Sequence, residues 1–462
     1  MSMSRTVRRY LDGWAEKPLH PFLAGSLDGL SRAVVIPALA ERDSLFTTLA
    51  DLACQPESEL AHTLVLVVVN NRAPSIDDPP DIRNNRETLE ILAAVIAGTD
   101  VKPAAGGPGL NESLACIRRS ALRLAAVDAS SPGFEIPDRD GVGLARKIGL
   151  DRALSVLDMS RGDPSFLVCL DADSRVDPGY LSAAGAFFAR GEAPGAVVDF
   201  AHQEAEDPVL QEAILRYELF LRAYVLGLRR AGSPYAFHTV GSTIACSGEA
   251  YAAVRGMSRR RAGEDFYFLN KLAKLGPVGR IGGTVVRPSP RPSLRVPFGT
   301  GRRMARVLSG EESAAGSLYA PEIFRILREW IRLAEESPDR SGEDRLAEAR
   351  RIHPALGRFL EEQAFPGAWE KIRRQAPGPA HLRRQFHGWF DAFRTLRAVH
   401  ALRDGGLPNV PLLEGVERLL QGTGCPDAAA RREETGKTAV AELLAVLREK
   451  DRESSEPRRF LP

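Results

Sequence analysis

The chain has no long hydrophobic run and no excess of charge of one sign. Its longest apolar stretch, residues 64–69, is far shorter than the roughly 20 residues of a membrane-spanning helix. Among 462 residues, 62 basic side chains accompany 60 acidic ones, and the formal net charge is +2. We therefore expect no transmembrane segment and no nucleic-acid partner, while peripheral contact with a membrane stays open.

Paired cysteines are also lacking. The five cysteines are odd in number and show no CxxC spacing, which argues against a disulfide framework or structural zinc and favours a reducing compartment. No apolar run follows the basic residues near the amino terminus, so no signal peptide is predicted. The expected location is the cytoplasm. The cysteines are Cys54, Cys116, Cys169, Cys246 and Cys425.

The composition that remains is that of a globular protein, with 44% hydrophobic and 26% charged residues. Its length allows two or three domains. Residues 33–37 and 63–69 are apolar and predict buried strands, with a helix over 40–49 between them. Nearly continuous apolar strands separated by a helix indicate an α/β fold with a mostly parallel sheet covered on both faces.

Changes in composition suggest a division of the chain. Residues 1–30 read as a leader, 31–303 as the α/β domain, and 304–462 as a mostly helical region. Clusters of Pro, Asp and Gly over 72–140 suggest an insertion before the sheet resumes. Its expected helices span 86–97 and 111–127.

An acidic motif, LDADSR at 170–175, follows the apolar run 165–170. The run predicts a buried strand, so Asp171 and Asp173 would emerge where open α/β sheets bind ligands. Two carboxylates at this spacing can reach one hard cation, or a cation and a sugar hydroxyl. An acidic turn that caps a helix is the alternative. A calcium loop would need a third acidic residue where Arg175 stands.

A glycine-rich helix start lies at residues 141–147, GVGLARK. Two glycines ahead of a helix that carries Arg146 and Lys147 make a plausible anion site. A tight turn before an ordinary amphipathic helix explains the same residues.

Taken in order, the motifs resemble those of family 2 glycosyltransferases with the GT-A fold, over about residues 31–290. The resemblance implies a nucleotide-diphosphate sugar donor, an unidentified hydroxyl acceptor and an inverting course. The motifs are VVIPALAE at 34–41, VVVNN at 67–71, GVGLARKIGLDRAL at 141–154, LDADS at 170–174, GS at 241–242 and GED at 263–265.

The resemblance also implies roles for the acidic residues. Asp173 would bind a divalent cation, Mg²⁺ or Mn²⁺, and Asp171 would bind the ribose or the same metal. Asp265 would be the general base that activates the acceptor, while Glu264 orients it. The alternative is that Glu264 and Asp265 only cap the helix that follows.

Other matched positions would form the donor site. Asn70 and Asn71 stand where many members carry acidic residues, so preference for a base cannot be read from them. Lys147 replaces an asparagine of the family pattern. The expected donor-binding residues are Pro37, Ala38, Glu41, Asn70, Asn71, Arg146, Lys147 and Asp171, with Arg302 and Arg303.

Two further features have competing explanations. His238 could complete a metal shell, but no motif fixes that role, and its apolar surroundings favour a core or acceptor-side histidine. Residues 295–303, with glycines at 299 and 301, could be a lid whose Arg302 and Arg303 bind diphosphate, or a solvated basic linker.

Two other functions compete with sugar transfer. Nucleotidyltransferases of related fold usually carry a glycine-rich loop after the first strand, where this chain has PALAE. A noncatalytic module that binds nucleotide sugars or glycans would not need Asp171, Asp173 and Asp265 together.

Overall fold

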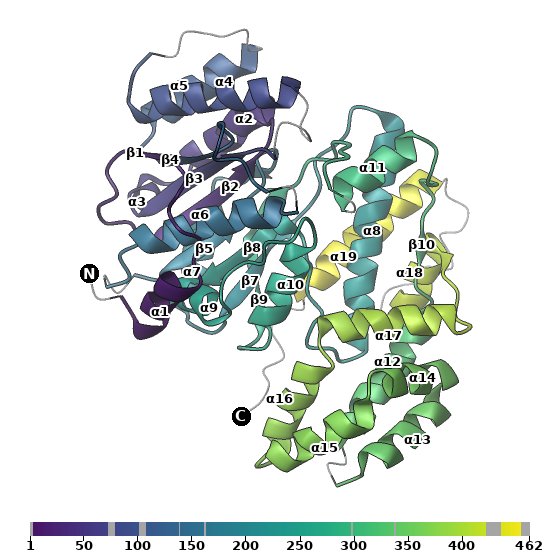
Figure 1. Ribbon diagram of the computed structural model, residues 1–462. Helices are drawn as coiled ribbons and strands as arrows, with labels where there is room; N and C mark the ends of the chain where they lie inside the picture. The colour runs from purple at the N-terminus through teal and green to yellow at the C-terminus, as the bar shows by residue number, and fades with distance from the viewer. Residues whose placement is uncertain are drawn as a thin grey trace. The chain divides into compact units, whose positions relative to one another are not determined.

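The computed structural model describes residues 3–72, 79–100, 108–137, 139–160, 163–296, 299–336, 339–421 and 436–453. They fall into two compact units (Figure 1). The first comprises residues 1–204, 239–289 and 295–298, and the second comprises 205–238, 290–294 and 299–462.

The first unit is built on a nine-stranded, mostly parallel sheet in the order β1-β4-β3-β2-β5-β8-β7-β9-β6. Strands β4, β3, β2 and β5 are mutually parallel, and β9 is parallel to β7. Strand β8 is antiparallel to both β5 and β7, and the short β1 and β6 pair antiparallel with β4 and β9. The strands are β1 Phe22–Ala24, β2 Arg32–Ala38, β3 Thr63–Asn70, β4 Arg123–Ala129, β5 Phe166–Cys169, β6 Arg175–Val176, β7 Gly195–Phe200, β8 Ile244–Ser247 and β9 Val278–Arg287.

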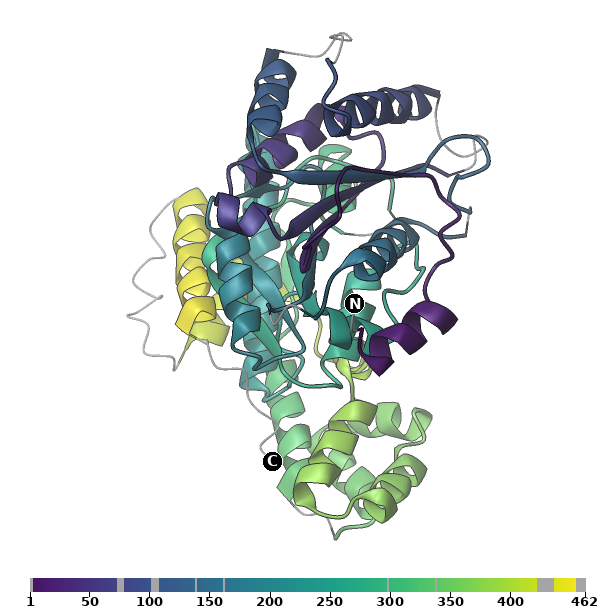
Figure 2. The same ribbon diagram turned by 90° about the vertical axis from the view of Figure 1, so that its left-hand side faces the viewer.

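Helices cover both faces of the sheet, as the unbroken apolar strands predict. Val34 and Ile36 of β2 belong to a core shared with helices α2, α4, α5 and α7. On the other face, Gly149 of α6 lies directly over Val35 and Val68, where an added Cβ would be 2.4 Å from Val35. Figure 2 shows α4 and α5 above the strands and α6 below them. The helices of this unit are α1 Arg5–Gly13, α2 Arg42–Ala53, α3 Glu57–Leu60, α4 Pro79–Ile96, α5 Pro108–Arg119, α6 Val142–Val156, α7 Tyr180–Ala189, η1 Gly241–Thr243, α9 Gly248–Ala253 and α10 Glu264–Leu272.

The expected helix over 111–127 is wrong in its second half. Helix α5 ends at Arg119, and Ser120 closes it, since its hydroxyl donates to the Ile117 carbonyl and accepts from Leu122 N–H. Residues 123–129 form β4, which lies between β1 and β3. Their alanines favour a helix, but pairing with two strands outweighs that propensity. This part of 72–140 is therefore part of the sheet.

Within its described residues, the second unit is helical apart from the two-stranded sheet of β10 and β11. Its core is rich in aromatic side chains, with Trp330 packed edge-to-face on Phe365 and Phe386. Leu219 and Leu226 of α8 belong to this core, which is why α8 groups with later helices. The elements are α8 Pro208–Arg230, α11 Thr300–Leu308, β10 Ser317–Leu318, α12 Pro321–Glu336, α13 Gly342–Ile352, α14 Pro354–Glu362, α15 Phe365–Gln375, α16 Pro379–Trp389, α17 Ala392–Asp404, β11 Val410–Pro411, α18 Leu412–Leu420 and α19 Gly436–Glu453.

None of the described helices combines the length and the apolar character that crossing a bilayer requires.

Candidate active site

The acidic motif forms a turn at the end of β5. The Leu170 N–H donates to the Val35 carbonyl, which extends the pairing with β2, and the Ser174 N–H donates to the Asp171 carbonyl at 3.1 Å. Asp171 and Asp173 are partly exposed, whereas Ala172 between them is buried. The bend therefore turns both carboxylates away from the core, as their spacing predicts.

A buried hydroxyl on α2 holds this turn from one side. Thr48 Oγ1 lies 2.8 Å from the Ala172 carbonyl oxygen and 2.9 Å from that of Ser174. One helical turn further along, Asp51 pairs with Arg175 at 2.5 and 2.7 Å. The same carboxylate accepts the Val176 N–H at 3.2 Å. Helix α2 thus fixes the backbone on which the acidic pair stands.

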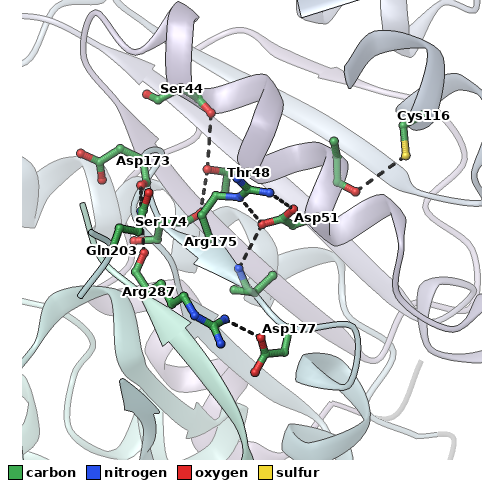
Figure 3. Close-up of polar contacts among 12 residues, drawn as sticks. Ser44, Thr48, Asp51, Cys116, Asp173, Ser174, Arg175, Asp177, Gln203 and Arg287 are labelled. Atoms are coloured by element: carbon green, nitrogen blue, oxygen red, sulfur yellow. Dashed lines mark hydrogen bonds and ion pairs between the residues drawn. The ribbon is translucent and has the colours of Figure 1, made fainter. Parts of the chain in front are cut away.

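Gln203 holds the turn from the other side. Its side-chain amide donates to the Asp173 carbonyl at 2.8 Å and to the Arg287 carbonyl at 2.7 Å, which ties the turn to the end of β9. Figure 3 shows the Asp173 carboxylate pointing away from Thr48 and Asp51. The backbone of the turn is therefore held on both sides, by Thr48 and by Gln203.

Arg146 joins the turn to the second acidic motif. The guanidinium projects from α6, is 4% exposed, and binds both Asp171 and Glu264. Gly241 leaves room for it, since a Cβ there would be 2.6 Å from Arg146 Nη2. The GS motif at 241–242 thus has a packing reason. One buried cation therefore connects residues from two distant parts of the sequence.

Asp265 lies next to Glu264 in the first turn of α10, which begins after Gly263 in the left-handed conformation (φ 71°). Burial raises the pKa of Asp265 to about 7, and the charge of Glu264 adds to the shift, while Arg146 opposes it. A carboxyl group with a pKa near neutrality can accept and return a proton at physiological pH. We call Arg146, Asp171, Glu264 and Asp265 the Arg146 cluster.

A second polar region lies at the ends of β2 and β3. Ala40 adopts a left-handed conformation (φ 50°), and its N–H donates to Asn85 Oδ1 at 2.8 Å. Asn85 Nδ2 lies 3.0 Å from the Asn70 carbonyl oxygen and 3.1 Å from Asn71 Oδ1. The Asn85 side-chain amide therefore connects the segment that follows β2 to the end of β3.

The expected donor-binding residues of this region are close together but largely engaged within the protein. Pro37, Ala38, Asn70 and Asn71 are buried. Asn71 Nδ2 donates to the Arg72 carbonyl at 2.9 Å, so both ends of its amide have partners within the protein.

Glu41, also expected at the donor site, is 8% exposed. It accepts a hydrogen bond from Ser44 at 2.7 Å and pairs with Arg295 at 2.5 Å. The first residue of the expected lid is thus attached to the end of β2. Pro297 and Phe298 of that segment lie outside the described residues.

Lys147 does not accompany Arg146 into the cluster. Its ammonium donates to Tyr10 Oη at 2.7 Å and to Asp151 at 2.9 Å, and the side chain is buried. Neighbouring residues of a helix project about 100° apart, so Arg146 and Lys147 reach different surroundings. The expectation that both contact the donor is not supported for Lys147.

The start of α6 is covered by backbone. The Gly143 N–H donates to the Arg260 carbonyl at 3.2 Å, and a Cβ at Gly143 would be 2.5 Å from that oxygen. A Cβ at Gly141 would be 2.9 Å from Arg261 Cα. These glycines permit the close approach of residues 258–261, and the tight-turn explanation replaces the anion site.

Three other expected site residues belong to the second unit. His238 Nε2 lies 3.0 Å from Asp451 Oδ2. Arg302 and Arg303 lie in the first turn of α11 rather than in an extended loop, and Arg303 pairs with Glu312 at 3.2 Å. The segment 295–303, expected to be a lid or a solvated linker, is thus helical from Thr300 onward.

The described residues contain no group of three or more His, Cys, Asp or Glu arranged to hold a metal ion.

Three residues that support the site, Thr48, Gln203 and Asn85, were not predicted from the sequence. Each acts on backbone carbonyls or amides of segments far away in sequence. No local pattern marks such residues, because Thr, Gln and Asn are common and their partners are set by the fold.

The chain matches no protein-family model and no curated protein sequence. Seventy-two chains of solved structures match its fold. TarS 1–349 from S. aureus in complex with UDP-GlcNAc is 14% identical, with 81% of this chain and 92% of that chain covered and a TM-score of 0.37. A mannosyltransferase from Pyrobaculum calidifontis in complex with GDP-Man and Mn2+ is 15% identical, with coverage of 83% and 94% and a TM-score of 0.33. At such values the likeness identifies neither a family nor a substrate for this chain.

Proposed function

We propose that the chain is a metal-dependent glycosyltransferase of GT-A type that transfers a sugar from a nucleotide-diphosphate sugar to a hydroxyl acceptor. One observation carries the proposal. Arg146 connects the turn bearing Asp171 and Asp173 to the helix start bearing Glu264 and Asp265. Groups suited to bind a leaving diphosphate and a group suited to take a proton are thereby brought together at the carboxyl end of β5.

The reaction breaks the bond between the anomeric carbon and the donor phosphate. The acceptor oxygen attacks that carbon, its proton passes to Asp265, and the nucleoside diphosphate leaves with added negative charge. A base on the face opposite to the leaving group inverts the anomeric configuration. Glu264, held by Arg146, orients the acceptor, and Arg146 keeps Asp171 in place.

The carboxylates of Asp171 and Asp173 are ligands that suit a hard divalent cation, bound together with the nucleotide sugar. Mg²⁺ is commonly held by one or two carboxylates plus substrate phosphates, so a cluster of three protein ligands is not required. Asp173 would be the direct ligand, and Asp171 the ligand or the ribose contact. When bound, the cation neutralises the charge that develops on the diphosphate.

The proposal also places the nucleotide sugar within the chain. Residues 31–303 would contain the catalytic domain, with Glu41 and the β2 and β3 ends near the nucleoside. The assignment of Arg302 and Arg303 to the diphosphate stays a prediction.

Hydrolysis of a panel of nucleotide sugars without acceptor tests the activity. We expect slow release of a nucleoside diphosphate from one donor with Mg²⁺ or Mn²⁺, and loss of release with a chelator. Asp173→Asn should abolish metal-dependent donor binding in calorimetry while the melting temperature stays near that of the wild type. Its carboxylate lies at a partly exposed turn whose backbone is held by other residues.

Binding of a nucleotide sugar without release under any metal condition would favour the noncatalytic module. Unchanged binding of donor and metal by Asp173→Asn would remove the assignment of the metal site. Glu204→Gln is a control, because this exposed acid directly follows Gln203, which holds the turn, but is not one of the proposed metal ligands.

A further inference from the structure

Two cysteines that are far apart in sequence lie side by side in the first unit. Cys54 directly follows the last residue of α2 and is exposed, and Cys116 lies in α5 and is half-buried. Their Sγ atoms are 3.7 Å apart, although the residues are separated by 62 positions. A disulfide needs an S–S distance of about 2.0 Å, so a small movement of the side chains would bring them into bonding range.

The other two cysteines of the described residues are buried, unlike Cys54 and Cys116. Cys169 in β5 and Cys246 in β8 are both 2% exposed. Burial raises the pKa of Cys169 to about 12 and that of Cys246 well above its ordinary value. Since the thiolate is the reactive form, these two core thiols are inert toward dissolved reagents. Exposure and proximity are combined at Cys54 and Cys116.

We propose that Cys54 and Cys116 form a redox modification site that a low-molecular-weight disulfide, such as oxidised glutathione, converts into a protein disulfide. The Cys54 thiolate attacks one sulfur of the oxidant and releases one glutathione thiolate, leaving a mixed disulfide. The Cys116 thiolate then attacks Cys54 Sγ and releases the second. The two protons of the protein thiols pass to the two glutathione thiolates, and one oxidant is reduced for each disulfide formed.

The two steps differ in difficulty. Burial, together with the hydrogen bond to Cys116, raises the pKa of Cys54, so the thiolate fraction at neutral pH is small and the first attack is slow. The second attack is intramolecular between sulfur atoms that already touch, and such reactions have a high effective concentration. The mixed disulfide should therefore be short-lived.

The position of the pair connects it to the acidic turn. Helix α2, which ends just before Cys54, also carries Thr48 and Asp51, the residues that hold the backbone of 172–176. Cys116 Sγ is 3.9 Å from the Ala50 carbonyl oxygen, and Figure 3 shows it beside the part of α2 that carries Asp51. Oxidation would thus fasten α5 to the helix that supports the turn.

Peptide mapping of the full-length chain tests the site. Folded protein is incubated with an excess of oxidised glutathione, its remaining thiols are alkylated, and it is digested without reductant. We expect a linked peptide pair containing Cys54 and Cys116, with a mass about 2 Da below the sum of the two thiol peptides. Dithiothreitol should restore both thiols. The disulfide should also raise the melting temperature, by roughly 5 °C, because it restricts the unfolded chain.

Three variants make the result specific. Cys54→Ser and Cys116→Ser should each lose the linked peptide and the rise in melting temperature. Cys425→Ser, at a position outside the described residues, should keep both. If one serine variant fails to fold, the other supplies the same comparison.

Separate glutathione adducts without a link would overturn the proposal. So would a link that involves Cys425 or one that forms only in denaturant. The readouts do not depend on catalysis, so failure here would leave the proposed function unaffected.

Discussion

Arg146 and Asp451 each form the centre of a buried ionic cluster, one in each compact unit, but the balance of charge differs. In the Arg146 cluster a single guanidinium faces Asp171, Glu264 and the neighbouring Asp265. In the second cluster, Asp451 is approached by three cationic or potentially cationic side chains: Arg222 at 2.6 Å, His238 at 3.0 Å and Arg229 at 3.2 Å. We call these four residues the Asp451 cluster.

The pKa values reflect this difference. Both carboxyl groups are desolvated, and burial alone would raise the pKa of each. For Asp451 the nearby His238 and Arg222 outweigh burial and hold the pKa well below its ordinary value. For Asp265 the charge of Glu264 adds to burial, and the pKa is raised to about 7. A carboxylate that stays charged is suited to a structural ion pair, whereas one that titrates near neutrality is suited to proton transfer.

Replacing the titrating carboxylate should have the largest effect. Asp265→Asn removes the proposed base and should lower turnover by 10²- to 10⁴-fold, while donor affinity stays within a few-fold. In the wild type, kcat/KM should rise with pH through about 7, because Asp265 cannot accept a proton while it is protonated. Steady-state rates across pH, with an identified acceptor, check both expectations.

In the Asp265→Asn variant the rise of kcat/KM near pH 7 should disappear, and in Asp451→Asn this rise should persist. Near-normal turnover of Asp265→Asn would contradict the assignment of the base.

The Asp451 cluster should respond in stability instead. Asp451→Asn removes the carboxylate that pairs with Arg222, Arg229 and His238 and leaves the buried Arg222 with Glu218 at 2.8 Å. This change should lower the free energy of unfolding by about 3 kcal/mol. The folded-state pKa of Asp451 lies below the unfolded value, so its contribution is present above about pH 4 and is lost as the pH falls further. Urea unfolding at neutral pH and at about pH 3 measures this, and the difference between variant and wild type should shrink in acid.

Asp404→Asn is the matched control. Asp404 pairs with Arg403 in the same unit but is exposed, so its replacement should change stability little. An equal loss in both variants would show that burial does not distinguish these ion pairs.

The sequence indicated which residues belong to the Arg146 cluster better than it indicated which of them contact each other. Strands β2, β3 and β5 were predicted because their apolar runs are unbroken, and the α/β class with a mostly parallel sheet is confirmed. Strand β4 was missed, since four of its central residues, LAAV, suit a helix equally well and only pairing with β1 and β3 decides.

Within the site, motif order suggested that Asp171 and Glu264 belong together, but not that Arg146 joins them. Adjacent Arg146 and Lys147 look equivalent in sequence and are separated only by the geometry of the helix. The contact of Cys54 with Cys116 was invisible for a similar reason. It depends on how α2 and α5 pack, and their spacing in sequence resembles no motif.

Thr48→Val should have the smallest effect and tests whether a neutral hydrogen bond matters beside the charged cluster. Valine keeps the shape of threonine but cannot donate to the Ala172 and Ser174 carbonyls, which lie 2.8 and 2.9 Å from Thr48 Oγ1. Leaving buried acceptors without a donor costs about 1–3 kcal/mol, so unfolding free energy should fall by that amount. Donor affinity should fall only a few-fold, because Gln203 still holds the Asp173 carbonyl.

Thr47→Val, the same change at the neighbouring, half-buried position, is the control for altered helix propensity. Denaturant unfolding and donor titration of both variants separate the two effects. Loss of donor binding as complete as in Asp173→Asn would mean that the Thr48 hydroxyl contacts the donor itself. Equal stability of Thr47→Val and Thr48→Val would mean that the turn is held by Gln203 and Asp51 alone.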